Sequence, residues 1–491
     1  MSFKAFLNKN KSIFLVFLLF LTLTGIMQFR VNEIIGFDGW LHIKSAELIR
    51  DNGFIKEFPY TTESILTENY ADLQLLLRIL LIPFTINPIT GAKTASILFA
   101  ALCFTFFYWY LKKNNINFPL FWTSLYAISS INLMYRFLLP RAMPLAILSL
   151  ILTLFFVDKK MYKSLLVTSL LFAWLYPGFV FQLVVIVTYF ILNLIINKKT
   201  NLKILLYPFI GILLALTINP YFPKNITLLF TQIFKVNLAN VFNAEWKPWN
   251  IIELLKVNYL LFTIFIIAII ATIKKAKLSK KTILFLALSI IFFIGMLRTR
   301  RMHEFFAPFT ILLASFTLND YAAKIKQKRA IKYILTVSLI IIAIFSLIKL
   351  DTHIKNNHFL PWYKEGVEWS KNNIPAGSKV FINGYTFNYL FFYNENLRYT
   401  HGIDLTYSHL KDKEKFNRYM DVLQGKDPGY NIIKEDYDAD YAIVGKVKQD
   451  IQLFNYIIKY KEDFELVYED ESVGILRIKE TVLNSKKKIK N

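Results

Sequence analysis

A succession of long apolar segments constrains this chain more than any other feature of its sequence. Eleven such segments follow one another, near residues 12–29, 91–111, 118–137, 142–157, 164–177, 178–196, 204–219, 253–273, 281–297, 303–318 and 331–349. A helix of about 20 apolar residues spans the hydrocarbon core of a bilayer. Because the 491 residues are 55% hydrophobic and 16% aromatic, we predict a polytopic α-helical membrane protein. It should cross the membrane about 11 times, or about 13 times if a short segment is divided differently.

The positive charges lie mainly between the apolar segments. The chain has 58 Lys and Arg against 34 Asp and Glu, a formal net charge of +24. Short loops rich in Lys and Arg stay in the cytoplasm, so we place the N-terminus and the basic loops inside, near residues 112–117, 158–163, 197–203, 274–281 and 324–332. Membrane orientation explains the charge, and no nucleic-acid partner is predicted. Cys103, the only cysteine, lies in an apolar segment and excludes an intrachain disulfide.

The loop at 30–72 differs from the basic loops because its acidic residues outnumber its basic ones. We place this loop outside the membrane. Only one crossing fits between it and the inside loop at 112–117, so the apolar stretch 73–86 is predicted to lie along the outer interface or to re-enter. The loop at 297–306, "LRTRRMHEFF", is basic although the alternation places it outside. Either it is another cytoplasmic loop, or its arginines bind an anion there.

From about residue 350 the sequence becomes charged, Asn-rich and interrupted by Pro and Gly. Periodic apolar positions predict helices, and β-rich stretches predict strands. The helices are expected over 362–373, 407–424 and 450–461, and the strands over 379–384, 440–445 and a hairpin at 464–479. A segment of about 140 residues can bury its own core. We therefore predict a transmembrane domain over 1–350 and a soluble extracytoplasmic α/β domain over 351–491.

The segment "DGWLHIKSAELIRDNG" (38–53) in the first outside loop carries the first candidate site. Asp38 suits the start of a helix and Gly53 its end. Asp38 and His42 lie four residues apart and therefore share one face of that helix. A carboxylate beside an imidazole at the membrane surface suits general-base or metal-assisted chemistry. The alternative is that Asp38 only caps the helix.

The order of these features resembles that of the GT-C superfamily of glycosyltransferases. A first membrane helix precedes an outside loop that opens with Asp38. "YADLQLLLRILLIPF" and "GAKTASILFA" resemble the interfacial helix and the second membrane helix of such enzymes. Further segments resemble parts of bacterial members: "INPYFPKN" (218–225), "EWKPWN" (245–250), "RTRRMHEFFAPF" (298–309), "FFYNENLRYTHGIDLTY" and "DYDADYAIVG". The superfamily includes oligosaccharyltransferase catalytic subunits and protein O-mannosyltransferases, which use polyprenyl-phosphate-linked sugars.

By this resemblance, Asp38 would be the essential carboxylate of the first outside loop. It would act as a base toward the acceptor, with His42 beside it, or help to hold a divalent metal such as Mg²⁺ or Mn²⁺. Asp72, a second outside carboxylate, would replace a missing ligand, and its alternative is a helix cap. The sequence lacks the later DxD and the "WWD"-like tripeptide of oligosaccharyltransferases. Metal use and asparagine glycosylation are therefore not implied by the resemblance.

Cations near the outer leaflet would stabilise the lipid phosphate, which gains negative charge as the glycosidic bond breaks. Arginine suits this task because its planar fork can bond to phosphate bidentately. The substrate- and phosphate-binding candidates are Arg136, Arg141, Glu245, Trp246, Arg298, Arg300, Arg301, His303 and Glu304. In the alternative interpretation, some of the arginines anchor the interface, His303 is structural, and Trp246 belongs to an aromatic belt.

We therefore predict an inverting GT-C glycosyltransferase of the bacterial cytoplasmic membrane, with its N-terminus inside and its C-terminal domain outside. It would move a sugar from a polyprenyl-phosphate-linked donor to a glycan, lipid or protein acceptor on the outer face. Two other functions are compatible with the sequence, a flippase or transporter for lipid-linked glycans and a non-catalytic membrane scaffold. A transporter predicts charged or broken segments at midplane depth, whereas the charges here lie at the ends of apolar segments.

Overall fold

The computed structural model of the chain describes residues 3–198, 200–236, 245–325, 329–357, 363–426, 431–446 and 450–479. The backbone forms two compact units, each built from segments that lie far apart in the sequence. Unit 1 comprises Met1–His42, Leu73–Phe222 and Ala244–Asn357. Unit 2 comprises Ile43–Asp72, Pro223–Asn243 and His358–Asn491. The domain boundary near residue 350 stays a prediction.

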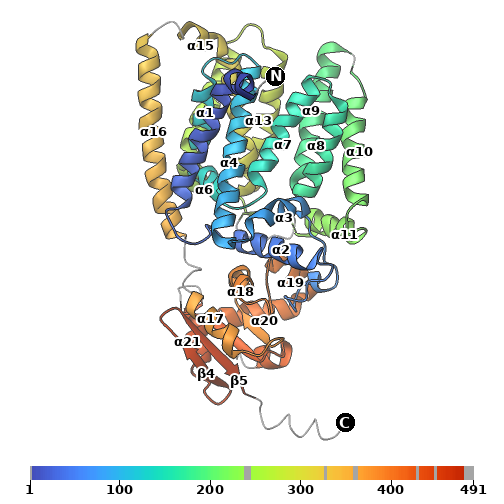
Figure 1. Cartoon of the computed structure of the whole chain (residues 1–491), viewed down its shortest axis with the longest axis vertical. Coiled ribbons are helices and arrows are strands. Elements are labelled where there is room, and N and C mark those ends of the chain that lie inside the picture. The colour runs from blue at the N-terminus through green and yellow to red at the C-terminus, as the bar shows by residue number, and fades with distance from the viewer. Residues whose placement is uncertain are drawn as a thin grey trace. The chain divides into compact units, whose positions relative to one another are not determined.

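Unit 1 is made of apolar helices (Figure 1). In the described ranges, six helical segments are long and apolar enough to cross a membrane. They are Asn10–Gln28 in α1 (Phe3–Gln28), α4 (Pro88–Lys113), η3 with α9 (Pro177–Asn197), α12 (Ile251–Ile273), α13 (Lys280–Arg298) and α16 (Arg329–Asn356). The predicted polytopic helical fold is confirmed.

Other predicted segments form shorter helices, namely α5 (Pro119–Ile128), α6 (Ile131–Leu138), α7 (Met143–Asp158), α8 (Tyr162–Leu175), α10 (Lys203–Thr217) and α14 (His303–Thr317). A further short helix, α15 (Asn319–Ile325), lies outside the predicted segments. With 14 residues in α8 and 15 in α10 and α14, these helices fall short of the about 20 residues that a perpendicular crossing needs. The predicted number of crossings therefore stays a prediction.

The predicted segment 118–137 is not one helix, which corrects the sequence interpretation. It breaks between α5 and α6, where Ser130 has an extended backbone. α6 ends at Leu138 because Leu139 precedes Pro140, and a residue before proline is pushed out of the helical region. α7 then leaves at an angle of 105° to α6. The sharp turn between them presents Arg141.

The stretch predicted to lie at the interface contains only the seven-residue α3 (Leu75–Leu81) and the short η2 (Ile82–Phe84). Seven helical residues rise only about 10 Å, far less than the bilayer core. α3 is therefore too short for a crossing by itself, and the placement of 73–86 at the interface stays a prediction.

Helix α2 (Asp38–Asn52) occupies almost the range predicted for it, and Gly53 after it adopts φ +74. Its N-terminal turn packs closely on the α6–α7 turn within unit 1. A methyl group built at Gly39 would overlap the ring of Pro140 and the side chain of Ile34. Only a glycine at this position lets Asp38 approach Arg141.

Unit 2 contains a five-stranded sheet of order β2-β1-β3-β5-β4. β1 (Lys379–Ile382) pairs in parallel with β2 (Arg398–Tyr399) and β3 (Tyr441–Gly445), and β5 (Val473–Ile478) pairs antiparallel with β3 and β4 (Phe464–Glu469). The predicted strands and hairpin are present, so the α/β class is confirmed. The remaining elements of the unit are α17 (Lys364–Asn373), η7 (Gly384–Thr386), α18 (Phe387–Tyr393), α19 (Leu405–Lys411), α20 (Lys413–Leu423), η8 (Asn431–Asp436) and α21 (Ile451–Ile457).

Part of the first loop belongs to this sheet, which the sequence did not predict. Thr61 forms a parallel bridge with Tyr399 of β2, and the Tyr399 N–H donates to the carbonyl of Tyr60 at 2.9 Å. Lys44 of α2 also pairs with Glu395 at 3.1 Å. Unit 2 thus includes η1 (Ile65–Thr67) from this loop, together with α11 (Lys224–Phe230) and η4 (Thr231–Val236) from another.

We expect Gly39→Ala to lower the melting temperature of the purified protein, because the added methyl group meets the rigid ring of Pro140. A matched control is Gly25→Ala in α1, where the added group meets only Ile97 at 4.0 Å. Alanine is favoured over glycine inside a helix by about 0.5–1 kcal/mol, so this control should be neutral or stabilising. Equal melting temperatures for the two variants would contradict the close packing of α2.

Candidate functional site

Three arginines of unit 1 converge on one carboxylate, that of Glu245. Arg136 of α6 approaches it at 2.8 Å, Arg141 of the α6–α7 turn at 3.1 Å and Arg301 of η5 (Arg300–Met302) at 3.3 Å. All three guanidiniums are largely buried. We call Glu245 and these arginines the arginine cluster.

Backbone contacts hold Glu245 in place. The N–H of Arg301 and the hydroxyl of Thr299 both donate to the carbonyl of Glu245 at 3.1 Å, and the N–H of Arg300 donates to the carbonyl of Lys247 at 3.1 Å. Thr299 also caps η5, accepting from the N–H of Arg301. The loop that carries Glu245 is therefore fixed against the connection between α13 and α14.

The arginines determine the ionisation of Glu245. Burial by itself raises the pKa of this carboxyl, but the charges of Arg136, Arg141 and Arg301 outweigh burial and hold the pKa well below its usual value. Glu245 is therefore an anion at neutral pH.

Two further carboxylates complete the charge balance. Arg141 pairs with Asp38, and Arg136 pairs with Glu304 of α14. The Glu304 side chain is only 1% exposed, whereas that of Asp38 is 34% exposed. Three cations thus meet three anions, and Asp38 is the most accessible carboxylate of the group.

Indole rings support the arginines on one side of the site. The guanidinium of Arg301 lies 4.8 Å from the ring centroid of Trp246, and that of Arg300 lies 4.9 Å from that of Trp249. Such cation–π contacts orient a guanidinium without consuming its N–H donors. Arg300 also pairs with Glu253 at 2.9 Å.

Several buried nitrogens here have no hydrogen-bond partner among the residues that the structure describes. They include Nε of Arg141, Nε of Arg301 and Nε2 of His303. His303 Nδ1 lies 2.7 Å from the carbonyl of Arg300, and a carbonyl can only accept. Nδ1 therefore carries the proton in the neutral ring, and Nε2 is left as an acceptor. The site thus offers two guanidinium donors and one imidazole acceptor.

His42 lies on α2 but contacts a different arginine. Its Nδ1 meets the guanidinium of Arg78 in α3, and its ring is buried. Burial lowers the pKa of His42 well below its usual value, and the charges of Arg78 and Arg141 lower it further. The imidazole is therefore neutral at pH 7.

The sequence matches no protein-family model and no curated protein. Solved structures do resemble the chain. AglB, an archaeal oligosaccharyltransferase from Archaeoglobus fulgidus solved with an inhibitory peptide and a dolichol-phosphate, aligns with a TM-score of 0.62 and 11% identity. The alignment covers 87% of this chain and 69% of AglB.

Two other structures align over nearly the whole chain. ArnT from Cupriavidus metallidurans, bound to undecaprenyl phosphate, gives a TM-score of 0.55 at 10% identity, covering 96% of this chain and 98% of ArnT. The mycobacterial arabinofuranosyltransferase AftD gives 0.55 at 11% identity, covering 95% of this chain and 41% of AftD. The chain has the GT-C fold.

Within this GT-C fold, unit 1 brings most of the predicted site residues together. The arginine cluster, with Asp38 and Glu304 paired to it, joins residues from four parts of the sequence, and Trp246, Arg300 and His303 adjoin it. Arg298 is exposed at the end of α13. Asp72 belongs to unit 2, where its side chain is buried. The roles assigned to all these residues stay predictions.

The residues around Asp38 do not fit a divalent metal, the alternative role that the resemblance suggested for this carboxylate. In the described ranges, no group of three or more His, Cys, Asp or Glu side chains could hold an ion. The neighbour of Asp38 is instead the guanidinium of Arg141, which is a cation and cannot be a ligand. We derive no chemical step through a metal.

Sequence reasoning missed two site residues, Arg78 and Trp249. Arg78 is a lone charge within the apolar run "LLLRILL", and a charge in such a run is a functional candidate by default. That signal could have found it. Trp249 lies in the quoted segment "EWKPWN", but nothing local predicted that its ring would lie against Arg300.

We expect Glu245→Gln to destabilise the protein by about 3 kcal/mol, because breaking a buried ion pair leaves its partners uncompensated. The control is Glu253→Gln, which removes a single, more exposed pair with Arg300 and should cost at most about 1 kcal/mol. Thermal unfolding of both variants in detergent measures the difference. Equal losses of stability in the two variants would contradict the role of Glu245 as the common partner of three arginines.

The same variant tests the ionisation of Glu245. Because the pKa of Glu245 is lower in the folded than in the unfolded chain, its stabilisation is fully present above about pH 4.5 and is lost as the pH falls through the folded value. Wild-type protein should therefore lose more stability than Glu245→Gln on acidification below about pH 4.5. Parallel pH profiles would contradict the lowered pKa.

Proposed function

We propose that this chain is a glycosyltransferase that moves a sugar from a polyprenyl-phosphate-linked donor to an acceptor on the outer face of a membrane. The observation that carries the proposal is the convergence of three arginines beside the partly exposed Asp38 carboxylate. The fold likeness supports it, because AglB and ArnT were solved with dolichol-phosphate and undecaprenyl phosphate, respectively.

In this proposal, the arginine cluster binds the phosphate of the donor lipid. Nε of Arg141 and Nε of Arg301 are donors without a partner among the described residues, and phosphate oxygens accept such hydrogen bonds strongly. Glu245 orients the guanidiniums, and Trp246 supports Arg301 from its ring face. As the glycosidic bond breaks, the bonding electrons pass to the phosphate oxygen, and the guanidiniums stabilise the charge that develops there.

Asp38 then acts as the general base. Its carboxylate removes the proton from the acceptor nucleophile, which attacks the anomeric carbon as the bond to the lipid phosphate breaks. A single displacement of this kind inverts the anomeric centre. Arg141 contacts both Asp38 and Glu245, so one side chain links the base to the phosphate site.

A lipid-linked glycan flippase is the second candidate. The 105° bend between α6 and α7 favours it, since transporters bind substrates at broken helices. A flippase moves the lipid-linked sugar without cleaving it and has no need of a general base at Asp38. The two functions therefore differ in what Asp38→Asn does.

We expect Asp38→Asn to reduce sugar transfer by about 10²- to 10⁴-fold, the usual contribution of a general base. A deletion strain identifies the cell-surface glycan whose synthesis depends on the protein. The assay then measures the amount of that glycan in cells that carry each variant, with equal amounts of the protein in the membrane. Asp51→Asn changes an exposed carboxylate of the same helix, which pairs with Arg50, and should retain activity. Full activity in Asp38→Asn would favour the flippase or a scaffold.

Arg141→Lys should weaken undecaprenyl phosphate binding about tenfold, because Lys keeps the charge but cannot reproduce the three-sided contact of the guanidinium with Asp38, Glu245 and the phosphate. Lipid-dependent thermal stabilisation of purified protein gives the Kd. Arg477→Lys is the control, since Arg477 is an exposed residue of β5 that pairs with Glu465. An unchanged Kd for folded Arg141→Lys protein would place the phosphate elsewhere.

A further inference from the structure

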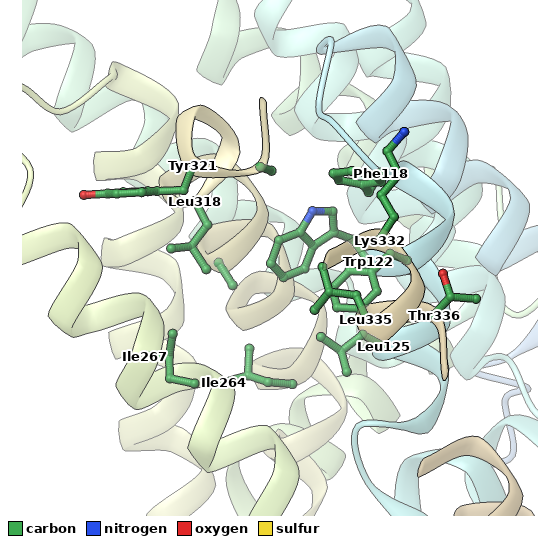
Figure 2. A pocket seen from close by; sticks show the side chains of 13 residues that line it. Phe118, Trp122, Leu125, Ile264, Ile267, Leu318, Tyr321, Lys332, Leu335 and Thr336 are labelled. Atoms are coloured by element: carbon green, nitrogen blue, oxygen red, sulfur yellow. The ribbon is translucent and has the colours of Figure 1, made fainter. Parts of the chain in front are cut away.

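Unit 1 contains an apolar cavity separate from the arginine cluster (Figure 2). Its volume is about 430 Å³, within the range of sites that bind small molecules. Five helices contribute to its walls, namely α5, α12, α14, α15 and α16. Figure 2 shows Trp122, Leu318 and Ile264 directed toward this space, with Leu335 beside them. Walls of this kind accept an alkyl chain.

Two polar groups on the cavity wall lack a partner. Trp122 is only 6% exposed, and its Nε1 has no hydrogen-bond partner among the described residues. An N–H buried without a partner costs free energy that an acceptor atom on a ligand would recover. Lys332 is half-buried, and no ion pair or hydrogen bond to its ammonium is found in the described ranges. In Figure 2 this ammonium lies away from Ile264 and Ile267.

The charge around Lys332 is basic. Lys324 near the end of α15 and Arg329 at the start of α16 both precede it in the sequence and are exposed. The nearest acidic side chain in α15, Asp320, is paired with Lys275 at 2.9 Å. The polar end of the cavity therefore favours an anion.

The helix that closes the cavity has few protein neighbours. Only 6% of the most apolar window of α16 is buried. α16 packs on α5 and α6 and also meets α12, where Lys349 lies over the ring of Tyr259, while residues of α12, α14 and α16 all line the cavity. An apolar occupant would supply the missing contacts.

We propose that this cavity binds an acyl chain of an anionic phospholipid. Lys332 and the adjacent basic residues hold the lipid phosphate, and Trp122 Nε1 donates to an ester carbonyl. The alkyl chain of such a lipid suits the apolar walls, its ester oxygen can accept from the indole N–H, and its negative charge pairs with the ammonium. Basic pockets between membrane helices bind anionic lipid head groups in this way. The proposal does not depend on the glycosyltransferase function.

The test uses purified full-length protein titrated with phosphatidylglycerol or phosphatidylcholine, with bound lipids counted by native mass spectrometry. The tightest lipid site should bind phosphatidylglycerol at least about fivefold more strongly than phosphatidylcholine. Lys332→Gln should remove most of this preference. Lys349→Gln, a charge change on the same helix but outside the cavity wall, should keep it. Equal binding of the two lipids by wild-type protein would overturn the proposal.

A second variant tests the position of the lipid. Thr336 lines the cavity from an exposed position on α16, so Thr336→Trp should fill the space and weaken phosphatidylglycerol binding at least about fivefold. Phosphatidylglycerol binding that survives both Thr336→Trp and Lys332→Gln would place the lipid elsewhere and overturn the proposal.

A fluorescence readout needs no change at Lys332 or Thr336. Phosphatidylglycerol with brominated chains should quench the tryptophan emission of the wild type more than that of Trp122→Phe, because Trp122 is the one tryptophan of the described residues that lines the cavity. Equal quenching of the two proteins would contradict a chain in contact with Trp122.

Discussion

The carboxylate of Glu245 is the interaction on which the rest of the site depends. Three guanidiniums that are largely withdrawn from water would repel one another without an anion between them. Glu245 supplies that anion, with N–O distances of 2.8, 3.1 and 3.3 Å. Its own backbone is held by Thr299 and Arg301. One loop residue therefore joins α6, the α6–α7 turn and η5 into a single electrostatic unit.

This unit also connects the phosphate site to the base in the proposed mechanism. Arg141 bonds to Glu245 and pairs with Asp38, and the absence of a side chain at Gly39 lets α2 come close enough for that pair. In that mechanism, an anionic lipid phosphate would bind beside Arg141, which is also the partner of Asp38. Donor binding would therefore change the electrostatic environment of the Asp38 carboxylate.

Local patterns predicted the elements well, because helix and strand periodicity is a property of neighbouring residues. α2, β1, β3 and the β4–β5 hairpin lie close to their expected ranges. The break between α5 and α6 was missed, since the apolar segment 118–137 continues through the extended residue Ser130. The site was predicted only as a collection of residue types. Arg136 and Glu245 lie 109 positions apart, and no spacing rule could show that they pair.

In the proposed mechanism, the arginine cluster receives the phosphate of a lipid-linked donor beside Asp38. A structure of the protein in a lipid nanodisc with undecaprenyl phosphate bound tests this. Phosphate oxygens should lie within about 3 Å of the guanidinium nitrogens of Arg141 and Arg301, with the Asp38 carboxylate facing the same space. A phosphate bound away from these arginines, with the cluster around Glu245 unchanged, would contradict it.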